Sequence, residues 1–292
     1  MMDAIPQGVV HFDHTATRIQ DHGDHVEIGF ANGKAVKAGI LIGVDGINSI
    51  VRKHLWGDSP KRPHNLHVIG GYTMNLPPGV NMQDSLSIVS HSKYTQGTYC
   101  KALSNGRNGY QWWVLEAWTD GKPAPANLAE YALKLASDFK SPLCDFIEST
   151  APGNIQRWPI RDRVPLKKWS KGRITLAGDA AHPTSPYAAY GAGMGICDGY
   201  FTGQRLHRVD LADTAAVIRA LEEYKACQLQ HTTEQVNNAY FMGRLFHHLP
   251  FPLTYIRDWI LDYTPYMQRT AAEDNPRQIA EHISVMGPGI TS

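Results

Sequence analysis

The sequence is poor in three features that would each assign it to a class of proteins. Its four cysteines lie far apart and form no C-x-x-C pair, so no zinc site or disulfide framework is expected, and no other metal site is either. Such cysteine usage predicts a reducing compartment, the cytoplasm. No block of like charge is present, and 28 basic residues balance 27 acidic ones, so nucleic acid is not an expected partner.

Long apolar runs are also scarce. The first ten residues, MMDAIPQGVV, lack a basic segment followed by an apolar run, and therefore no secretory signal is expected. The most apolar stretch, residues 241–261, is interrupted by prolines and charged residues, so it predicts a packed or interfacial helix pair and no transmembrane segment. The 292 residues, 42% of them hydrophobic, suffice for one large domain or two modest ones.

Apolar patterning predicts a mixed α/β (α+β) fold. Residues 8–45 are typical of a ladder of short strands, which ends in the continuous apolar segment GILIGVD. That segment predicts a strand buried on both faces, and Asn48 or Ser49 can cap a short helix after it. A second buried strand is predicted in RITLAGD, residues 173–179.

The segments between these strands have a different pattern. Residues 67–118 alternate between apolar and polar positions and predict an antiparallel sheet with one covered face. Residues 127–149 have helical spacing, and residues 155–165 are typical of another strand. Helical periodicity then dominates from residue 195 onward, apart from a short break before residue 214.

One loop carries the strongest chemical signal. The strand RITLAG ends at Asp179, and Gly191-Ala192-Gly193 begins a helix. In open α/β sheets ligands bind beyond the carboxyl ends of strands, where a glycine-rich helix start offers free N–H groups. A carboxylate at that place can accept hydrogen bonds from polyol hydroxyls. The loop suits an anionic or carbonyl-bearing cofactor, and ordinary turn chemistry is the alternative interpretation.

Two segments give the chain a resemblance to a known family. GVDGINSIVR, residues 43–52, is similar to the Asp-Gly motif of the FAD-dependent aromatic hydroxylases, the flavin monooxygenases of the salicylate-hydroxylase and p-hydroxybenzoate-hydroxylase type. GDAAHPTSP…GAGMGICDG, residues 178–199, is similar to their Gly-Asp motif. The resemblance covers nearly the whole chain. It implies a partial, Rossmann-like FAD-binding domain with C-terminal helices at 1–65 and 151–292, and a substrate-binding antiparallel sheet with covering helices at 66–150.

The resemblance also implies a set of cofactor-binding positions. Asp179 would face the ribityl hydroxyls, the backbone of 191–193 would face the edge of the flavin ring, and Asp45 would lie near the pyrophosphate. Termination of a strand is the alternative role for Asp45, and Arg52 would stabilise the short helix or its approach to the cofactor. The full implied set is Asp45, Gly178, Asp179, Pro186, Gly191, Ala192 and Gly193.

The reaction implied by the resemblance is hydroxylation of a small aromatic or polyketide-like metabolite with FAD, NADH or NADPH, and oxygen. In this family the flavin carries the chemistry, while the protein binds, orients and excludes water. His182 and Tyr190 are the candidate catalytic side chains; a structural hydrogen bond to the loop is the alternative for His182. Tyr190 stands where relatives tend to have a small residue, so its ring is expected either to fill part of the flavin space or to point outward.

One family motif has no counterpart in the sequence. No G-x-G-x-x-G turn is present, so the first βαβ unit is expected to be missing and the chain alone is expected to hold FAD poorly. An open sheet edge then predicts an oligomer or a partner chain. Two further hypotheses follow from this absence: a flavin-independent cyclase or isomerase on the same scaffold, and a noncatalytic remnant or partner subunit.

Three smaller predictions concern aromatic and charged residues. Trp112 and Trp113 alternate along a strand, so at most one of them lines a pocket for a flat substrate. Residues 161–163, Arg-Asp-Arg, predict a surface ion pair, and contact with substrate or cofactor is the alternative. Residues 247–248, two adjacent histidines, are expected at a helix end.

Overall fold

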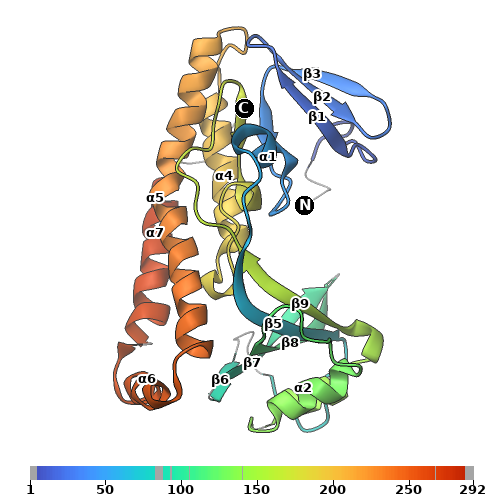
Figure 1. Ribbon diagram of the computed structural model, residues 1–292, viewed down its shortest axis with the longest axis vertical. Helices are drawn as coiled ribbons and strands as arrows, with labels where there is room; N and C mark the ends of the chain where they lie inside the picture. Colours follow the sequence, from blue (N-terminus) through green and yellow to red (C-terminus); the bar gives the residue numbers. More distant parts are fainter. Residues whose placement is uncertain are drawn as a thin grey trace. The chain divides into compact units, whose positions relative to one another are not determined.

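A computed structural model of the protein describes residues 5–82, 88–92, 94–104, 106–139, 141–266 and 268–286 (Figure 1). The chain divides into two compact units. Unit 1 comprises Met1–Lys61, Asp162–Asn237 and Pro276–Ser292, and unit 2 comprises Arg62–Arg161 and Asn238–Asn275. All of 151–161 and all of 238–275 thus group with the antiparallel sheet, whereas the family resemblance implied that they belong with the flanking segments.

Unit 1 begins with the predicted strand ladder. Strands β1 (Ala16–Asp21), β2 (Val26–Phe30) and β3 (Ala35–Ala38) form an antiparallel sheet in that order. Residues 8–13, also expected to be a strand, are irregular. The ladder therefore starts later than the sequence pattern indicated.

The two apolar strands of unit 1 pair with each other. Strand β4 (Leu41–Gly43) runs parallel to β10 (Ile174–Leu176), with Leu41 opposite Ile174. Strand β10 is buried throughout, as predicted. The prediction of burial on both faces is wrong for β4, because only Gly43 is fully buried and β4 pairs only with β10 within the described residues.

A helical layer packs on this strand pair. It consists of α1 (Ile50–Trp56), α4 (Gly191–Leu206) and the first part of α5 (Thr214–His247), with α7 (Asn275–Ser284) later in the chain; the short η5 (Gln268–Asp274) belongs to unit 2. Val51 and Leu55 are both buried, as their spacing predicted. They share one core cluster with β10, Phe201 of α4 and Tyr224 of α5.

A buried arginine ties the loops of unit 1 together. Arg173 is fully buried just before β10, and its guanidinium donates to the carbonyls of Gly23 (2.7 Å), Gly39 (2.9 Å) and Leu211 (2.8 Å). It also donates to Thr214 Oγ1 at 2.7 Å. One side chain therefore joins the β1–β2 turn, the β3–β4 connection and the start of α5.

Unit 2 is built around a five-stranded sheet in the order β6-β7-β8-β5-β9. Its strands are β5 (Arg62–Thr73), β6 (Ile88–Ser92), β7 (Thr95–Ser104), β8 (Arg107–Ala117) and β9 (Ile155–Asp162). The pairs β5–β8, β6–β7 and β7–β8 are antiparallel, which confirms the predicted sheet. Helices α2 (Leu128–Ala136) and α3 (Leu143–Glu148) cover it, followed by the short η2 (Pro152–Asn154).

The tryptophans of β8 lie on opposite faces, as their alternation predicted. Trp112 is fully buried against Phe146 and Ile147 of α3, and its Nε1 donates to Thr150 Oγ1 at 2.9 Å. Trp113 is only partly buried. Core packing is therefore the role of Trp112.

The C-terminal helices agree with the sequence-based predictions. Residues 241–261 form the end of α5 and helix α6 (Phe251–Tyr263), the expected helix pair. His247 and His248 lie at the end of α5 and contact the backbone carbonyls of Tyr94 (2.7 Å) and His64 (2.8 Å). Within the described residues, no helix has both the length and the hydropathy to cross a membrane.

The surface ion pair predicted at residues 161–163 is confirmed for one arginine only. Arg161 contacts Asp120 at 2.9 Å near the surface. Arg163 is buried and donates to the backbone carbonyls of Ile47 and Ser59, so it fixes the loop after β4.

Candidate cofactor site

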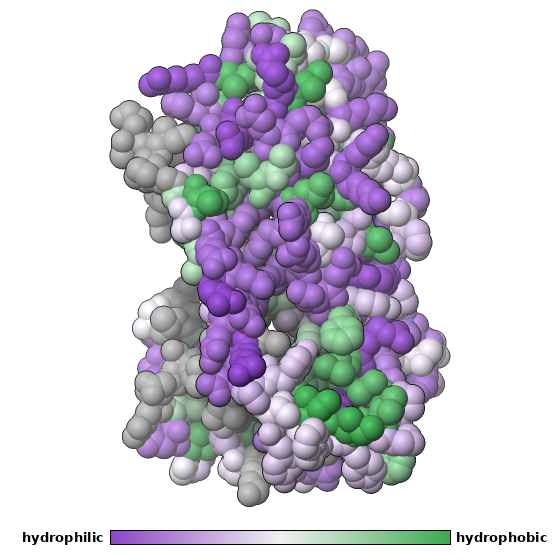
Figure 2. Space-filling view, turned by 90° about the vertical axis from the view of Figure 1, so that its left-hand side faces the viewer, coloured by the Kyte–Doolittle hydropathy of each residue, from purple (hydrophilic) through white to green (hydrophobic). Residues whose placement is uncertain are grey.

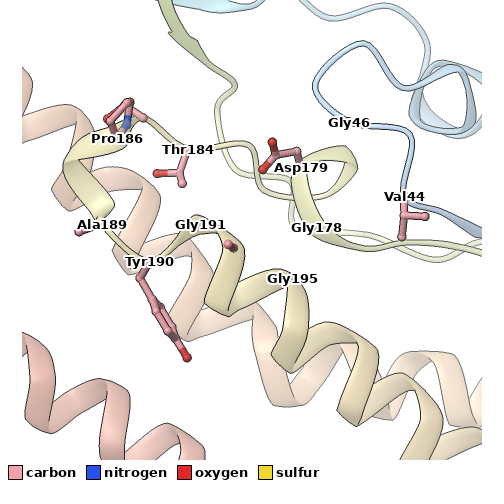
Figure 3. A pocket seen from close by; sticks show the side chains of 12 residues that line it. Val44, Gly46, Gly178, Asp179, Thr184, Pro186, Ala189, Tyr190, Gly191 and Gly195 are labelled. Carbon is pink, nitrogen blue, oxygen red and sulfur yellow. The ribbon is translucent and has the colours of Figure 1, made fainter. Parts of the chain in front are cut away.

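A cleft of about 680 Å³ lies at the carboxyl ends of β4 and β10 (Figure 3). Two residues of the β4–α1 loop, Val44 and Gly46, form part of its wall. The rest comes from the loop between β10 and α4 and from the first turns of α4: Gly178, Asp179, Thr184, Ser185, Pro186, Ala189, Tyr190, Gly191, Ala192 and Gly195. A volume of this size is typical of small-molecule sites.

In the turn from β4 into α1, side chains of the turn accept hydrogen bonds from the first N–H groups of the helix. Asp45 Oδ2 accepts hydrogen bonds from the N–H groups of Ile50 (2.7 Å) and Val51 (3.3 Å). Ser49, the predicted N-cap, accepts from the N–H of Arg52 at 2.8 Å. The first donors of α1 are thus occupied by side chains. The Asp45 carboxylate caps a helix and is not part of the cleft lining.

The turn from β10 into α4 is arranged differently. Gly178 has a φ of +55°, a conformation that favours glycine, and begins the short helix η3 (Gly178–Ala180). A second short helix, η4 (Pro186–Ala188), precedes α4, whose N-cap position, Tyr190, makes no side-chain cap. The first backbone hydrogen bond of α4 runs from Met194 N to Tyr190 O. Among the described residues, none accepts from the N–H groups of 191–193, which leaves them available to a ligand.

A buried aspartate holds the β10–α4 turn in place. Asp198 of α4 is fully buried, and its Oδ2 accepts from the N–H of Gly178 at 2.6 Å and contacts His182 Nε2 at 2.7 Å. One carboxylate therefore fixes both sides of Asp179. The sequence analysis missed Asp198; its only signal was an acidic residue in an otherwise apolar and glycine-rich helical segment.

His182 lies outside the cleft lining. Its side chain is nearly fully buried, and its ring packs 5.2 Å from that of Trp169. The contact with Asp198 orients the imidazole within the loop. The geometry is that of a structural histidine, although its partner is a carboxylate and not the backbone that the alternative interpretation proposed.

Arg52 connects the two turns. It is buried on α1 and donates to the carbonyls of Ala180 (3.1 Å) and Ala181 (3.0 Å). Burial, with Arg163 nearby, lowers the pKa of Arg52 to about 10, so the guanidinium stays charged at neutral pH. Arg52 therefore positions the loop that carries Asp179 and does not line the cleft itself.

Three polar side chains of the cleft have no hydrogen-bond partner among the described residues. The Asp179 carboxylate is exposed in the cleft, where partial desolvation raises its pKa and His182 opposes that rise. Thr184 Oγ1 and Ser185 Oγ are buried and make no hydrogen bond within the described structure. Buried hydroxyls normally have partners, so these atoms point to a polar ligand.

Tyr190 points out of this polar part of the cleft. Figure 3 shows its ring directed away from Thr184 and Asp179. The hydroxyl lies 3.3 Å from Cys197 Sγ, and the ring packs edge-on against His231. A Cβ atom at Gly193 would lie 2.1 Å from the Tyr190 ring, so Gly193 is required by this packing. Tyr190 is still a lining residue of the cleft, and its ring packs against α4 and α5.

The structure brings together five of the seven positions that the resemblance implied. Gly178, Asp179, Pro186, Gly191 and Ala192 all line the cleft. Gly193 supports the helix start, and Asp45 caps α1. Within the described residues, no group of three metal-binding side chains is close enough to hold an ion.

The cleft fits the ring and ribityl part of a flavin. The open N–H groups of 191–193 match carbonyl oxygens and ring nitrogen atoms, and Asp179 matches the hydroxyls of a polyol. Thr184 and Ser185 supply hydroxyls without protein partners. Gly46 and Gly178 have room around their Cα atoms, which permits close approach of a flat ring. The fold and the cleft together define a flavin-binding α/β protein.

Comparison with known proteins supports the assignment of a flavin-binding protein. The sequence matches the FAD binding domain family over residues 5–239, and the chain belongs to this family of FAD-dependent aromatic hydroxylases. It is 31% identical over 236 residues, 77% of its length, to 6-hydroxynicotinate 3-monooxygenase of Bordetella bronchiseptica. It is 29% identical over 267 residues, 88% of its length, to 3-amino-4-hydroxybenzoate 2-monooxygenase PtmB3 of Streptomyces platensis. The chain spans 59% and 64% of the lengths of these two relatives.

Solved structures show the same fold. HpxO of Klebsiella pneumoniae, in complex with FAD and uric acid, matches with a TM-score of 0.75 at 20% identity, covering 94% of this chain and 67% of that one. A salicylate hydroxylase substrate complex matches with a TM-score of 0.65 at 18% identity, covering 98% and 73%. The predicted mixed fold with a flavoprotein-type unit and an antiparallel sheet is confirmed.

Proposed function

We propose that this chain supplies the flavin-ring end of an FAD-dependent monooxygenase that hydroxylates a small aromatic compound with NADH or NADPH and oxygen. The observation that carries the proposal is the uncapped start of α4 next to the unpaired Asp179 carboxylate. The names of the relatives, a 6-hydroxynicotinate and a 3-amino-4-hydroxybenzoate monooxygenase, support the substrate class.

The bound flavin would supply the redox chemistry, which no side chain of the cleft could replace. The backbone N–H groups of 191–193 would bind and orient the polar edge of the ring. Asp179 would accept hydrogen bonds from the ribityl hydroxyls, and Asp198 and Arg52 would keep its loop in position. Neither His182 nor Tyr190 is assigned a proton-transfer step, because one is buried on Asp198 and the other packs on α4 and α5.

Three further parts of the proposal concern the surroundings of the site. Unit 2, with its antiparallel sheet, is proposed as the substrate-binding part of the enzyme. The edge of β4 that faces away from β10 has no strand partner within the described residues, and we propose that another chain covers it. The four cysteines are free, which supports a reducing, cytoplasmic location.

The proposal is tested by flavin titration. The chain is purified, and FAD, FMN and riboflavin are added separately while absorption between about 350 and 500 nm and flavin fluorescence are recorded. Because the cleft offers contacts to ring and ribityl atoms, the three flavins are expected to bind with affinities within about tenfold of one another. The replacement Asp179→Ala should lower the affinity for each of the three flavins by roughly tenfold to a hundredfold.

A matched control separates binding from folding. Asp58 is an exposed carboxylate of unit 1 that pairs with Lys53 on the surface, at 3.5 Å. Asp58→Asn should leave all three affinities within about twofold. Absence of any flavin signal at saturating concentrations would reject the proposal. The comparisons do not favour the flavin-independent cyclase or isomerase, which would predict turnover without flavin, nicotinamide or oxygen.

A further inference from the structure

Helix α6 exposes most of its apolar side chains, whereas both of its buried side chains are polar. Its buried residues are Thr254 and Arg257. The exposed fractions of its apolar residues range from 37% to 77%: Phe251, Leu253, Tyr255, Ile256, Trp259, Ile260 and Tyr263. Figure 2 shows hydrophobic residues gathered in the lower part of the molecule, where α6 lies in Figure 1. A surface helix normally has the opposite arrangement.

The buried arginine explains why α6 is oriented in this way. Arg257 is 3% exposed, and its Nη1 donates to the carbonyls of Phe246 (2.8 Å) and Leu245 (3.4 Å) at the end of α5. It also pairs with its neighbour Asp258. These contacts satisfy carbonyl groups at a helix C-terminus, so turning the apolar face inward would leave them without a partner. The outward apolar face is thus fixed by the packing of unit 2.

The exposed area is large enough for a stable protein interface. At roughly 200 Å² for a whole side chain of this kind, the seven exposed fractions amount to about 800 Å². A standard interface buries about 800 Å² on each partner. Aromatic side chains such as Trp259 and the two tyrosines are enriched at the centres of such interfaces.

The charges of α6 decide between a protein and a membrane surface. A helix that lies on a membrane carries lysines and arginines around its apolar face. The only basic residue of α6 is the buried Arg257, whereas Asp258 and Asp262 lie beside the exposed face. Acidic residues next to the apolar face oppose contact with anionic lipid.

We propose that α6 is the contact surface between two copies of this chain. A two-fold symmetric dimer needs only one self-complementary patch, and an apolar helix face satisfies that condition. Packed antiparallel across the axis, the two α6 helices would place Ile256 and Trp259, near the middle of the exposed face, closest to their symmetry mates. The dimer does not depend on flavin binding.

The test is the molar mass in solution. Sedimentation is measured for the purified chain over protein concentrations from about 0.1 to 100 µM, where the unmodified chain should form dimers. Replacement Ile256→Asp places like charges across the axis and should weaken the dimer at least about a hundredfold. Ile256→Lys should do the same. An equimolar mixture of the two variants should associate again, since opposite charges then face each other.

Matched controls keep the result interpretable. Ile256 is 56% exposed, so at protein concentrations low enough for the original chain to be monomeric both variants should unfold at the same temperature as the original chain. Phe12→Asp changes an apolar residue that is 72% exposed but outside α6, and it should leave the dimer intact. A monomer at every concentration would overturn the proposal, and so would a dimer unaffected by either Ile256 variant. Cosedimentation of the chain with neutral phosphatidylcholine vesicles, abolished by Ile256→Asp, would identify a membrane as the occupant and would overturn it too.

Discussion

The two strand-to-helix turns of unit 1 have similar parts and different uses. Each follows one of the paired parallel strands, each has an aspartate at the strand end, and each leads into a helix. In the β4–α1 turn the Asp45 carboxylate and the Ser49 hydroxyl occupy the first N–H groups of α1. In the β10–α4 turn the Asp179 carboxylate lies in the cleft, and the first N–H groups of α4 have no acceptor among the described residues.

The difference shows how a structural turn can be told from a ligand-binding turn. Open donors at a helix start and an unpaired carboxylate both lower stability unless a ligand or water completes them. In the β10–α4 turn they are retained, and buried side chains from elsewhere, Asp198 and Arg52, hold the loop in place. Completeness of the backbone hydrogen bonding thus separates the two turns better than their sequence motifs do.

The largest expected effect comes from removing the link between the turns. Arg52→Leu leaves the carbonyls of Ala180 and Ala181 buried without their donor and should lower the free energy of unfolding by about 3 kcal/mol. Urea denaturation measures this change. Flavin affinity should fall as well, because the Asp179 loop loses its support. An unchanged urea midpoint would show that the two turns are independent.

A smaller effect is expected at the start of α4. Gly193→Ala places a Cβ atom against the Tyr190 ring and should cost about 2 kcal/mol of stability. The double variant Gly193→Ala, Tyr190→Ala provides the control, since removal of the ring removes the clash. If the glycine replacement costs as much without the ring as with it, the packing explanation is wrong. Thermal unfolding of the four proteins in this cycle gives the answer.

A replacement in the β4–α1 turn should change the stability of the protein and not its flavin affinity. Asp45→Ala removes acceptors from the N–H groups of Ile50 and Val51 and should cost about 1 kcal/mol. Flavin affinity should stay within about twofold, because Asp45 is not part of the cleft lining. A loss of flavin binding with little loss of stability would instead give Asp45 the ligand role that the family resemblance implied.

A replacement of Asp179 in the β10–α4 turn should cause the smallest change in stability, and this change should be a gain where the other replacements cause a loss. The folded protein raises the pKa of Asp179, so ionisation of this carboxyl lowers stability as pH increases through that pKa. Asp179→Asn removes this effect and should make the chain slightly more stable at pH 7. The gain should disappear near pH 3, where the carboxyl is protonated in both the folded and the unfolded states. A destabilised Asn variant at pH 7 would mean that Asp179, like Asp45, has a structural role.

Local sequence patterns predicted much of this arrangement. The Ser49 cap, the shared face of Val51 and Leu55 and the opposite faces of Trp112 and Trp113 all follow from spacings of a few residues. The positions of Asp179, Gly191 and Ala192 in one cleft also followed from motif order and family resemblance. Each of these features depends on residues close together in the chain or on a shared motif.

Other features depended on contacts that no spacing encodes. Asp198 reaches Gly178 across 20 positions, and Arg52 reaches Ala180 across 128. Residues 241–261 were predicted to be a helix pair, but the outward orientation of the apolar face of α6 follows from the contact of Arg257 with the end of α5. Such pairings arise only when separate elements pack together.

The sequence by itself determined the type of most elements and the cap of α1, because caps, glycines and apolar periods act over a few residues. The sequence also set the number of residues between each aspartate and the next α-helix. Asp45 lies close enough to α1 to cap it, whereas residues 180–190 separate Asp179 from α4. Only the tertiary structure decided that this longer loop returns beside the open helix start and leaves a carboxylate in the cleft. The reason is that its position depends on buried polar contacts from distant segments, whose partners are chosen by packing.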